Sequence, residues 1–186
     1  MSATPLEAGT GVDRGFTTYD GPTGIERRAD QTIEAAMAWL DAADMSKPWL
    51  LWVHLYDPHN PYAAPEPWRD QFVGQGDQAP WLAEREFVET SNRPTGQKVE
   101  TVKANDRYDG EIAFCYHHFG RLIAHLEETK LEDSTTVIVL SDHGEAFGEH
   151  RFHFHGHTLF EEEIRVPLII KGPGIVPGQT HTRVSL

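Results

Sequence analysis

Cysteine, positive charge and long apolar runs are all scarce in this chain of 186 residues. The one cysteine, Cys115, excludes an internal disulfide and leaves the redox compartment open. The longest apolar run, residues 49–56, contains His54 and is far shorter than the roughly 20 residues that cross a bilayer. No signal peptide is visible in residues 1–5 (MSATP), which offer neither a basic start nor an apolar stretch; this would exclude secretion only if Met1 were the true start.

Basic residues are too few for nucleic acid to be an expected partner. The chain has 16 Lys and Arg against 29 Asp and Glu, a formal net charge of -13. Phosphate backbones are bound by clustered Lys and Arg, so we expect no nucleic acid partner. An anionic small substrate stays open, because a metal ion can invert the local potential. Histidine is abundant by contrast, with 11 in all.

The hydrophobic pattern alternates between helix and strand periods. It predicts helices over 27–43 and 108–128, short helices over 81–89 and 159–164, and strands over 49–55, 135–140 and 166–171. Residues 57–80 and 144–157 are predicted loops. The strands are nearly continuous apolar runs, which is typical of strands covered on both faces. We therefore expect an α/β fold with a mostly parallel sheet flanked by helices.

The segment 141–145 (SDHGE) follows the predicted strand 135–140 directly. Ligands of open α/β sheets collect at the carboxyl ends of strands. Asp142 and His143 offer a carboxylate and an imidazole there, half of a metal site. By ligand hardness this pair suits manganese or zinc better than calcium. A turn in which Asp142 caps a following helix is the alternative.

A second strand end, within residues 52–62 (WVHLYDPHNPY), presents His59. Pro58 and Pro61 stiffen the segment, so His59 should keep a fixed direction. A fixed imidazole can donate to an anionic substrate oxygen or protonate a leaving group. We interpret His54 instead as a buried strand residue with a backbone partner.

The loop after residue 144 is rich in histidine. If extended, residues 153–157 would put His153, His155 and His157 on one side, where they could bind metal; a solvated loop is the alternative. Cys115 lies on the apolar stripe of its helix and is predicted to be a small core residue. The run of glutamates at 161–163 is predicted to be a charged helix face.

Five segments together resemble the sulfatase family of the alkaline phosphatase superfamily. They are 11–20 (GVDRGFTTYD), 52–62 (WVHLYDPHNPY), 108–122 (YDGEI…GRL), 139–145 (VLSDHGE) and 155–170 (HGHTLFEE…RVPLII). The segments are spread over nearly the whole chain, and their order and spacing match those of the family. The resemblance implies an alkaline-phosphatase-like fold and a substrate that is a small-molecule or carbohydrate sulfate ester.

The resemblance also implies roles for five residues. Asp142 and His143 would be metal ligands, for Ca²⁺ first and Mn²⁺ or Zn²⁺ as alternatives. His59 and His157 would be catalytic residues that contact the sulfate group, with His155 as the neighbouring candidate for sulfate binding. In the family, the metal stabilises an oxyanion nucleophile, a hydrated formylglycine, which attacks sulfur and forms a covalent sulfate intermediate.

The sequence departs from the family pattern at the nucleophile. The Cys/Ser-x-Pro-x-Arg motif that yields formylglycine does not occur, and Cys115 is followed by Tyr116, His117 and His118. The first Asp-Asp metal pair is also absent. We therefore expect residues 1–186 to be part of a catalytic domain whose nucleophile-bearing half precedes Met1, inactive alone and weak in metal affinity. An exported location, periplasmic or extracellular, would require a signal peptide in that preceding part.

Two other functions fit the same motifs. A phosphodiesterase, phosphonate monoester hydrolase or phosphoethanolamine transferase would share the Asp-His-Gly strand end and differ mainly in its nucleophile. A non-catalytic metal-binding module would keep the fold and the histidine cluster without hydrolysis.

Overall fold

The computed structural model describes residues 6–22, 24, 26–74, 104–180 and 184. They fall into two compact units. Unit 1 contains the described residues up to 74 and 104–125, and unit 2 those from 126 onward. The predicted short helix at 81–89 lies outside the described residues. Within the described ranges, no helix combines the length and the apolar character needed to cross a membrane.

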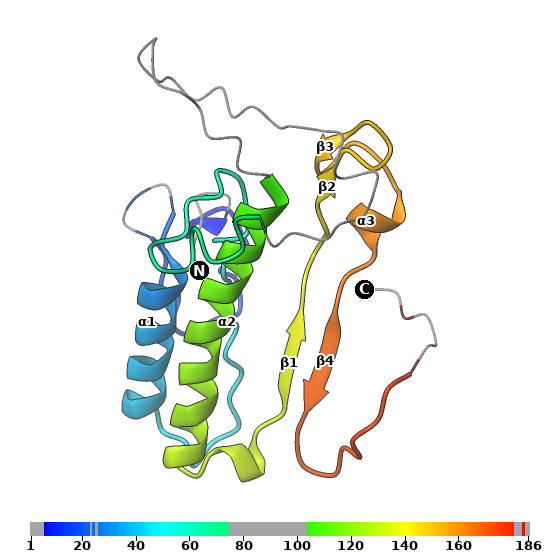
Figure 1. Ribbon diagram of the computed structural model, residues 1–186. Coiled ribbons are helices and arrows are strands. Elements are labelled where there is room, and N and C mark those ends of the chain that lie inside the picture. Colours follow the sequence, from blue (N-terminus) through cyan, green and yellow to red (C-terminus); the bar gives the residue numbers. More distant parts are fainter. Residues whose placement is uncertain (1–5, 23, 25, 75–103, 181–183, 185–186) are drawn as a thin grey trace. The chain divides into compact units, whose positions relative to one another are not determined.

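Unit 1 is built on two long helices, α1 (Ala29–Ala42) and α2 (Ala104–Glu128), which run side by side in Figure 1. Both confirm predicted helices, and α2 begins four residues before the predicted start at 108. The sequence predicts an apolar stripe of Ile33, Ala36, Met37 and Leu40 on α1. The buried face is Ala29, Thr32, Ile33, Ala36 and Leu40, which includes three of these four residues. The ion pair between Arg121 and Glu34, at 3.6 Å, joins the two helices.

The core of unit 1 lies where α2 meets the start of α1. Ala29, Ala64, Phe114 and Cys115 form a buried cluster against which Leu55 and Trp68 pack. Cys115 is thus a core residue, as predicted. The sequence predicts an apolar stripe of Tyr108, Ile112, Cys115, Phe119, Leu122 and Leu126 on α2. It is partly wrong, because Ile112 is 42% exposed whereas Phe114, which lies outside the stripe, is 1% exposed. The α2 face turns toward Trp68, whose ring lies edge-on to Phe114 at 5.2 Å.

Unit 2 contains two antiparallel strand pairs. After a 3₁₀ turn, η2 (Glu132–Ser134), β1 (Val137–Leu140) pairs with β4 (Leu168–Lys171) in the register Val137↔Lys171 to Leu140↔Leu168. The chain between them forms β2 (Ala146–Phe147), β3 (His153–Phe154) and one helical turn, α3 (Glu161–Ile164). β2 pairs antiparallel with β3, and these three short elements lie beyond the carboxyl end of β1 (Figure 1).

The predicted parallel sheet does not occur among the described residues. The strands at 135–140 and 166–171 are present but shorter, and they are antiparallel. A parallel return needs a crossover that travels the length of the strand, usually a helix. The segment 141–167 instead folds at one end of β1, so the chain re-enters at Leu168, opposite Leu140.

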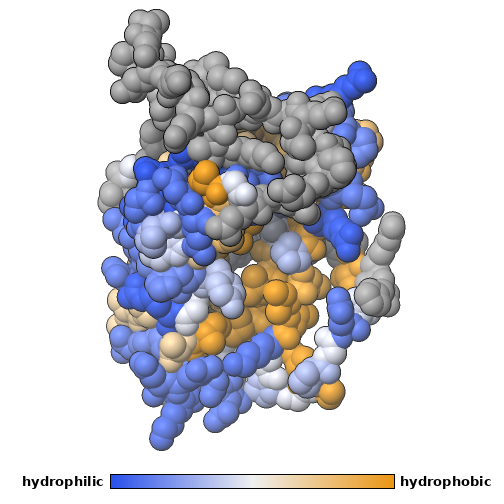
Figure 2. Space-filling view, in the orientation of Figure 1, coloured by the Kyte–Doolittle hydropathy of each residue, from blue (hydrophilic) through white to orange (hydrophobic). Residues whose placement is uncertain are grey.

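The predicted strand at 49–55 is also wrong for this structure, since residues 49–55 do not pair as a strand with any described segment. An apolar run becomes a strand only when a neighbour satisfies its backbone groups. Leu50 and Trp52 are 75% and 60% exposed, so the run is not a buried one. β1 and β4 likewise expose Ile138 and Ile169, and Figure 2 shows apolar side chains gathered over these strands.

Candidate functional site

The carboxyl end of β1 presents Asp142 and His143 with donor atoms close together. The backbone N–H of His143 donates to Asp142 Oδ1 at 3.1 Å, and Asp142 Oδ2 lies 3.8 Å from His143 Nε2. His143 Nδ1 lies 2.7 Å from the carbonyl oxygen of Gly144. Because a carbonyl only accepts, Nδ1 carries the proton and Nε2 is the lone-pair nitrogen of the neutral ring. Nε2 therefore faces the Asp142 carboxylate, and its lone pair and Asp142 Oδ2 are close enough to bind one metal ion.

His155 lies against His143. Their rings stack with centroids 3.9 Å apart. The β2–β3 pairing explains the proximity, because the register Ala146↔Phe154 puts Glu145 and His155 at the next position. His155 Nδ1 donates to Glu145 Oε1 at 3.1 Å, and the Glu145 side chain is only 4% exposed. A buried carboxylate bonded to one ring nitrogen fixes the orientation and tautomer of the other.

Gly144 and Glu163 join the end of β1 to α3. The Gly144 N–H donates to the backbone oxygen of Glu163 at 2.7 Å. A side chain at Gly144 would meet the Glu162 carbonyl oxygen at 2.1 Å, so only glycine fits here. The Glu163 carboxylate accepts the backbone N–H of His157 at 3.3 Å. The predicted charged face at 161–163 is thus wrong for Glu163, which is 3% exposed.

Residues 153–157 are not extended, so the expected placement of His153, His155 and His157 on one side does not arise. The strand β3 ends at Phe154, and φ angles of 69° at Phe154 and 81° at Gly156 turn the backbone. His155 turns onto His143, while His157 follows the turn at Gly156. Sequence reasoning also missed Glu145 and Glu163, and no local pattern distinguishes Glu163 from the two glutamates before it.

His59 belongs to unit 1, whereas Asp142, His143, His155 and His157 belong to unit 2. The His59 ring stacks on Tyr56 at 4.4 Å, and its Nδ1 lies 2.7 Å from the Asn60 carbonyl oxygen. The stack and the contact at Nδ1 hold the ring in this orientation, and the carbonyl partner keeps the proton on Nδ1.

Two buried carboxylates fix the loop that carries His59. Asp57 Oδ1 accepts the backbone N–H of Ala29 at 2.9 Å, and Glu111 Oε1 accepts that of Ala63 at 2.5 Å. Burial raises the pKa of Asp57 above its ordinary value and that of Glu111 to about 7. Burial, with these two carboxylates nearby, also raises the pKa of the Cys115 thiol, which makes it a poor nucleophile.

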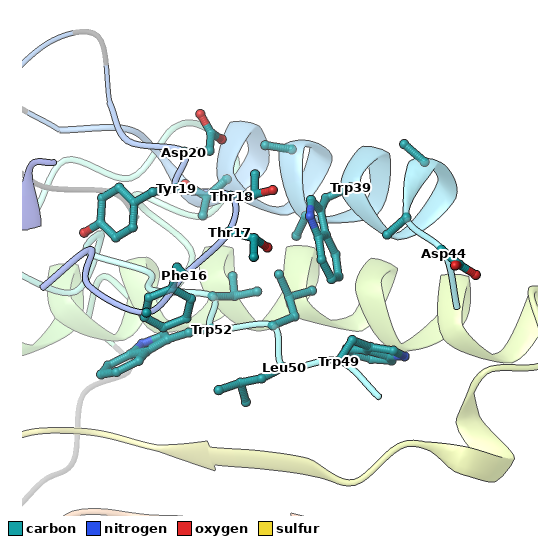
Figure 3. A pocket seen from close by; sticks show the side chains of 18 of the residues that line it. Phe16, Thr17, Thr18, Tyr19, Asp20, Trp39, Asp44, Trp49, Leu50 and Trp52 are labelled. Carbon is teal, nitrogen blue, oxygen red and sulfur yellow. The ribbon is translucent and has the colours of Figure 1, made fainter. Parts of the chain in front are cut away.

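A hollow of about 900 Å³ in unit 1 contains none of the predicted site residues. It lies between α1 and residues 14–20 and 48–53, and its walls include Phe16, Trp39, Trp49 and Trp52 (Figure 3). Its walls are mainly aromatic and aliphatic, and the charged side chains among them are those of Arg14, Asp20, Arg27 and Asp44.

The residues of unit 2 fit half of a metal site. Two bonds of about 2.1–2.4 Å from one cation can span donors 3.8 Å apart, the separation of Asp142 Oδ2 and His143 Nε2. The Asp142 side chain is 80% exposed and open to such an ion. Within the ranges that the structure describes, no group of three or more His, Cys, Asp or Glu side chains could hold a metal. Further ligands would have to come from elsewhere.

Known proteins resemble the chain along most of its length. The family model described as Sulfatase matches residues 13–186. A choline-sulfatase of Rhizobium meliloti is 32% identical over 153 residues, which cover 75% of this chain and 29% of that protein. The multifunctional alkaline phosphatase superfamily protein PehA of Trinickia caryophylli is 30% identical, with 83% and 35% covered. Arylsulfatase K of Rattus norvegicus is 30% identical, with 84% and 32% covered.

Solved structures show the same fold. The yidJ protein of Bacteroides fragilis, named as a sulfatase, superposes with a TM-score of 0.61 at 22% identity, over 81% of this chain and 32% of that one. The chain spans about a third of the length of these curated and solved relatives. The match from residue 13 to residue 186 shows that this chain belongs to the sulfatase family of the alkaline phosphatase superfamily.

Proposed function

We propose that the chain is part of a metal-dependent sulfuric ester hydrolase and supplies half of its metal site together with the histidines that contact sulfate. The arrangement of Asp142, His143 and His155 at the end of β1, in a chain of this family, is the observation that carries the proposal. We also propose that residues 1–186 are one part of the catalytic domain, and that the part with the formylglycine nucleophile precedes them.

Asp142 and His143 would hold the metal through Oδ2 and Nε2. The Gly144 carbonyl keeps the Nδ1 proton of His143 in place, so Nε2 is the available ligand atom in the neutral ring. We propose Ca²⁺, with Mn²⁺ and Zn²⁺ as alternatives. When bound, such a cation polarises the ester oxygen and stabilises negative charge on the nucleophile.

His59, His155 and His157 would contact the sulfate group. A protonated ring nitrogen neutralises a sulfate oxygen, and the same nitrogen can give its proton to the leaving alcohol. Glu145 would hold the orientation and tautomer of the His155 ring through the bond at Nδ1. We assign the catalytic roles to His59 and His157. The substrate is proposed to be a small-molecule or carbohydrate sulfate ester.

Phosphoester chemistry is the second candidate. The relative PehA, 30% identical over 182 residues, is named multifunctional within the alkaline phosphatase superfamily. A phosphodiester and a sulfate ester present similar tetrahedral groups to a metal and histidines, so the same residues could serve both.

Metal binding by the 186-residue chain tests the proposed ligands. Titration calorimetry with CaCl₂, MnCl₂ and ZnCl₂ should give weak binding that D142N and H143A each reduce about tenfold or more. D133N, an exposed aspartate of the same unit, is the matched control. Equal affinity in D142N and D133N would exclude Asp142 as a ligand.

Turnover by the protein produced from its native gene tests the reaction. We expect hydrolysis of 4-methylumbelliferyl sulfate to exceed that of bis(4-nitrophenyl) phosphate. H59A and H157A should lower kcat for the sulfate by about 10²–10⁴-fold. A preference for the phosphodiester would favour the second candidate instead, and a native protein without a formylglycine motif would refute the sulfatase proposal.

A further inference from the structure

The Glu163 carboxylate accepts four hydrogen bonds, although the residue lies in a run of three glutamates. Its Oε2 accepts the backbone N–H groups of Gly156, His157 and Thr158 at 2.8, 3.3 and 3.4 Å. Its Oε1 accepts the hydroxyl of Thr158. Glu163 is 3% exposed, so its side chain is buried although Gly156 and His157 are exposed.

The same residue contacts the segment that leaves β1. Its backbone oxygen accepts the Gly144 N–H at 2.7 Å, directly after His143. The close approach of Glu162 to Gly144, which leaves no space for a side chain, shows that α3 packs tightly at this point. One residue is therefore hydrogen-bonded to the chain beside His143 and to the backbone of His157.

The chemistry of these bonds favours a carboxylate. Hydrogen bonds from the Thr158 hydroxyl, and then from the backbone N–H groups, lower the pKa of Glu163, so the group is ionised at neutral pH. An ionised carboxylate accepts on both oxygens and donates nothing. A glutamine has the same shape but no charge, so its single oxygen is a weaker acceptor for the three N–H groups, and its NH₂ group would face Thr158 Oγ1, which would then accept instead of donate.

We propose that Glu163 is a positioning residue, which fixes residues 156–158 against the end of β1 and so keeps His157 at a constant distance from His143. This role rests on the proposed sulfate site, in which His157 contacts the sulfate and His143 the metal. Glu163 itself would contact neither the sulfate nor the metal. It acts through the backbone of the segment that carries His157, and through Gly144.

Amide hydrogen exchange tests the link without any need for turnover. In E163Q, exchange at Gly156, Thr158 and Gly144 should rise together by about tenfold or more, since they share one support. E161Q is the matched control, because Glu161 is the exposed first residue of the same helical turn. Unchanged exchange at Gly144, with a rise confined to 156–158, would overturn the link between the two segments.

Kinetics of the native gene product test the consequence. E163Q should lower kcat/KM for 4-methylumbelliferyl sulfate about 10–100-fold, with E161Q unchanged. E163D, which keeps the charge on a shorter side chain, should recover part of the loss, as a merely packing role would not. Equal kcat/KM in E163Q and E161Q would refute the positioning role. Absence of turnover in the wild type would instead refute the proposed function, and the exchange experiment would still decide the link.

Discussion

At the scale of single residues, Gly144 shows how closely the end of β1 and α3 pack. A Cβ there would lie 2.1 Å from the Glu162 carbonyl oxygen, which is backbone and cannot rotate away. We expect G144A to lower the free energy of unfolding by about 2–4 kcal/mol. Urea unfolding followed by circular dichroism measures this change.

Gly120 supplies the matched control for that substitution. It is an exposed position within α2, and a Cβ there would meet nothing within 4 Å. G120A should therefore raise the free energy of unfolding by about 0.5–1 kcal/mol, the ordinary gain in a helix. If both variants changed stability equally, the close contact at Gly144 would be refuted.

Glu111 makes the stability of unit 1 depend on pH. Burial raises its pKa from 4.5 to about 7, so the folded chain binds this proton more tightly than the unfolded chain does. The stabilising effect is complete below about pH 4.5 and is lost as pH rises to about 7. Ionised Asp57 and Glu26 nearby act in the same direction.

We expect E111Q to remove this dependence. The amide oxygen can still accept the Ala63 N–H but the group no longer titrates. Between pH 5 and pH 8 the wild type should lose on the order of 1–3 kcal/mol more of its unfolding free energy than E111Q. Urea unfolding at four pH values gives the comparison, and parallel curves for the two proteins would contradict the assignment to Glu111.

At the scale of elements, α1 begins without a cap from its own N-terminal residue. Arg28 at the N-cap position makes no capping hydrogen bond with its side chain, and Asp57 Oδ1 accepts the N–H of Ala29 instead. The cap thus comes from 28 residues further along the chain. It couples the start of α1 to the segment that presents His59.

Loss of this cap should cost stability in proportion to the missing acceptor. D57A should lower the free energy of unfolding by about 1–2 kcal/mol, the usual effect of a lost N-cap. D57N keeps the acceptor oxygen, and the raised pKa of Asp57 means that burial disfavours its charge, so this variant should stay close to the wild type. Thermal unfolding of the two variants decides; equal losses would show that charge, and not the acceptor, matters.

At the scale of the whole molecule, the described surface carries many large apolar side chains. They include Leu50, Trp52, Ile138, Leu140, Ile169 and Ile170, all more than 40% exposed. Apolar patches of this kind bind hydrophobic dyes and promote association. The sequence predicts these runs as buried strands, whereas the residues that the structure describes leave these six side chains exposed.

Two leucines of the predicted strand at 49–55 separate the exposed part from the buried part. Leu50 is 75% exposed, whereas Leu55 packs against the core of unit 1. L50K should change the free energy of unfolding by less than about 0.5 kcal/mol and reduce binding of the dye ANS. L55A should cost about 1–3 kcal/mol. A large loss of stability in L50K would mean that the run is buried after all.

The sequence by itself determined the features that depend on neighbours a few residues away. The apolar period of 3.6 predicted α1 and α2, and the runs at 135–140 and 166–171 predicted β1 and β4. The motifs around His59, Asp142 and His157 carried the family, because each is a short string of fixed spacing. Such features are local, so the chain alone specifies them.

Tertiary structure decided what depends on residues far apart in the chain. The antiparallel pairing of β1 with β4 follows from the path of residues 141–167, and the stack of His143 on His155 follows from the β2–β3 register. Glu163 has the same neighbours in sequence as a solvated glutamate, yet it is buried by Gly156 and Thr158. Burial and pairing are set by which segments meet in space, and residue type and period do not encode that choice.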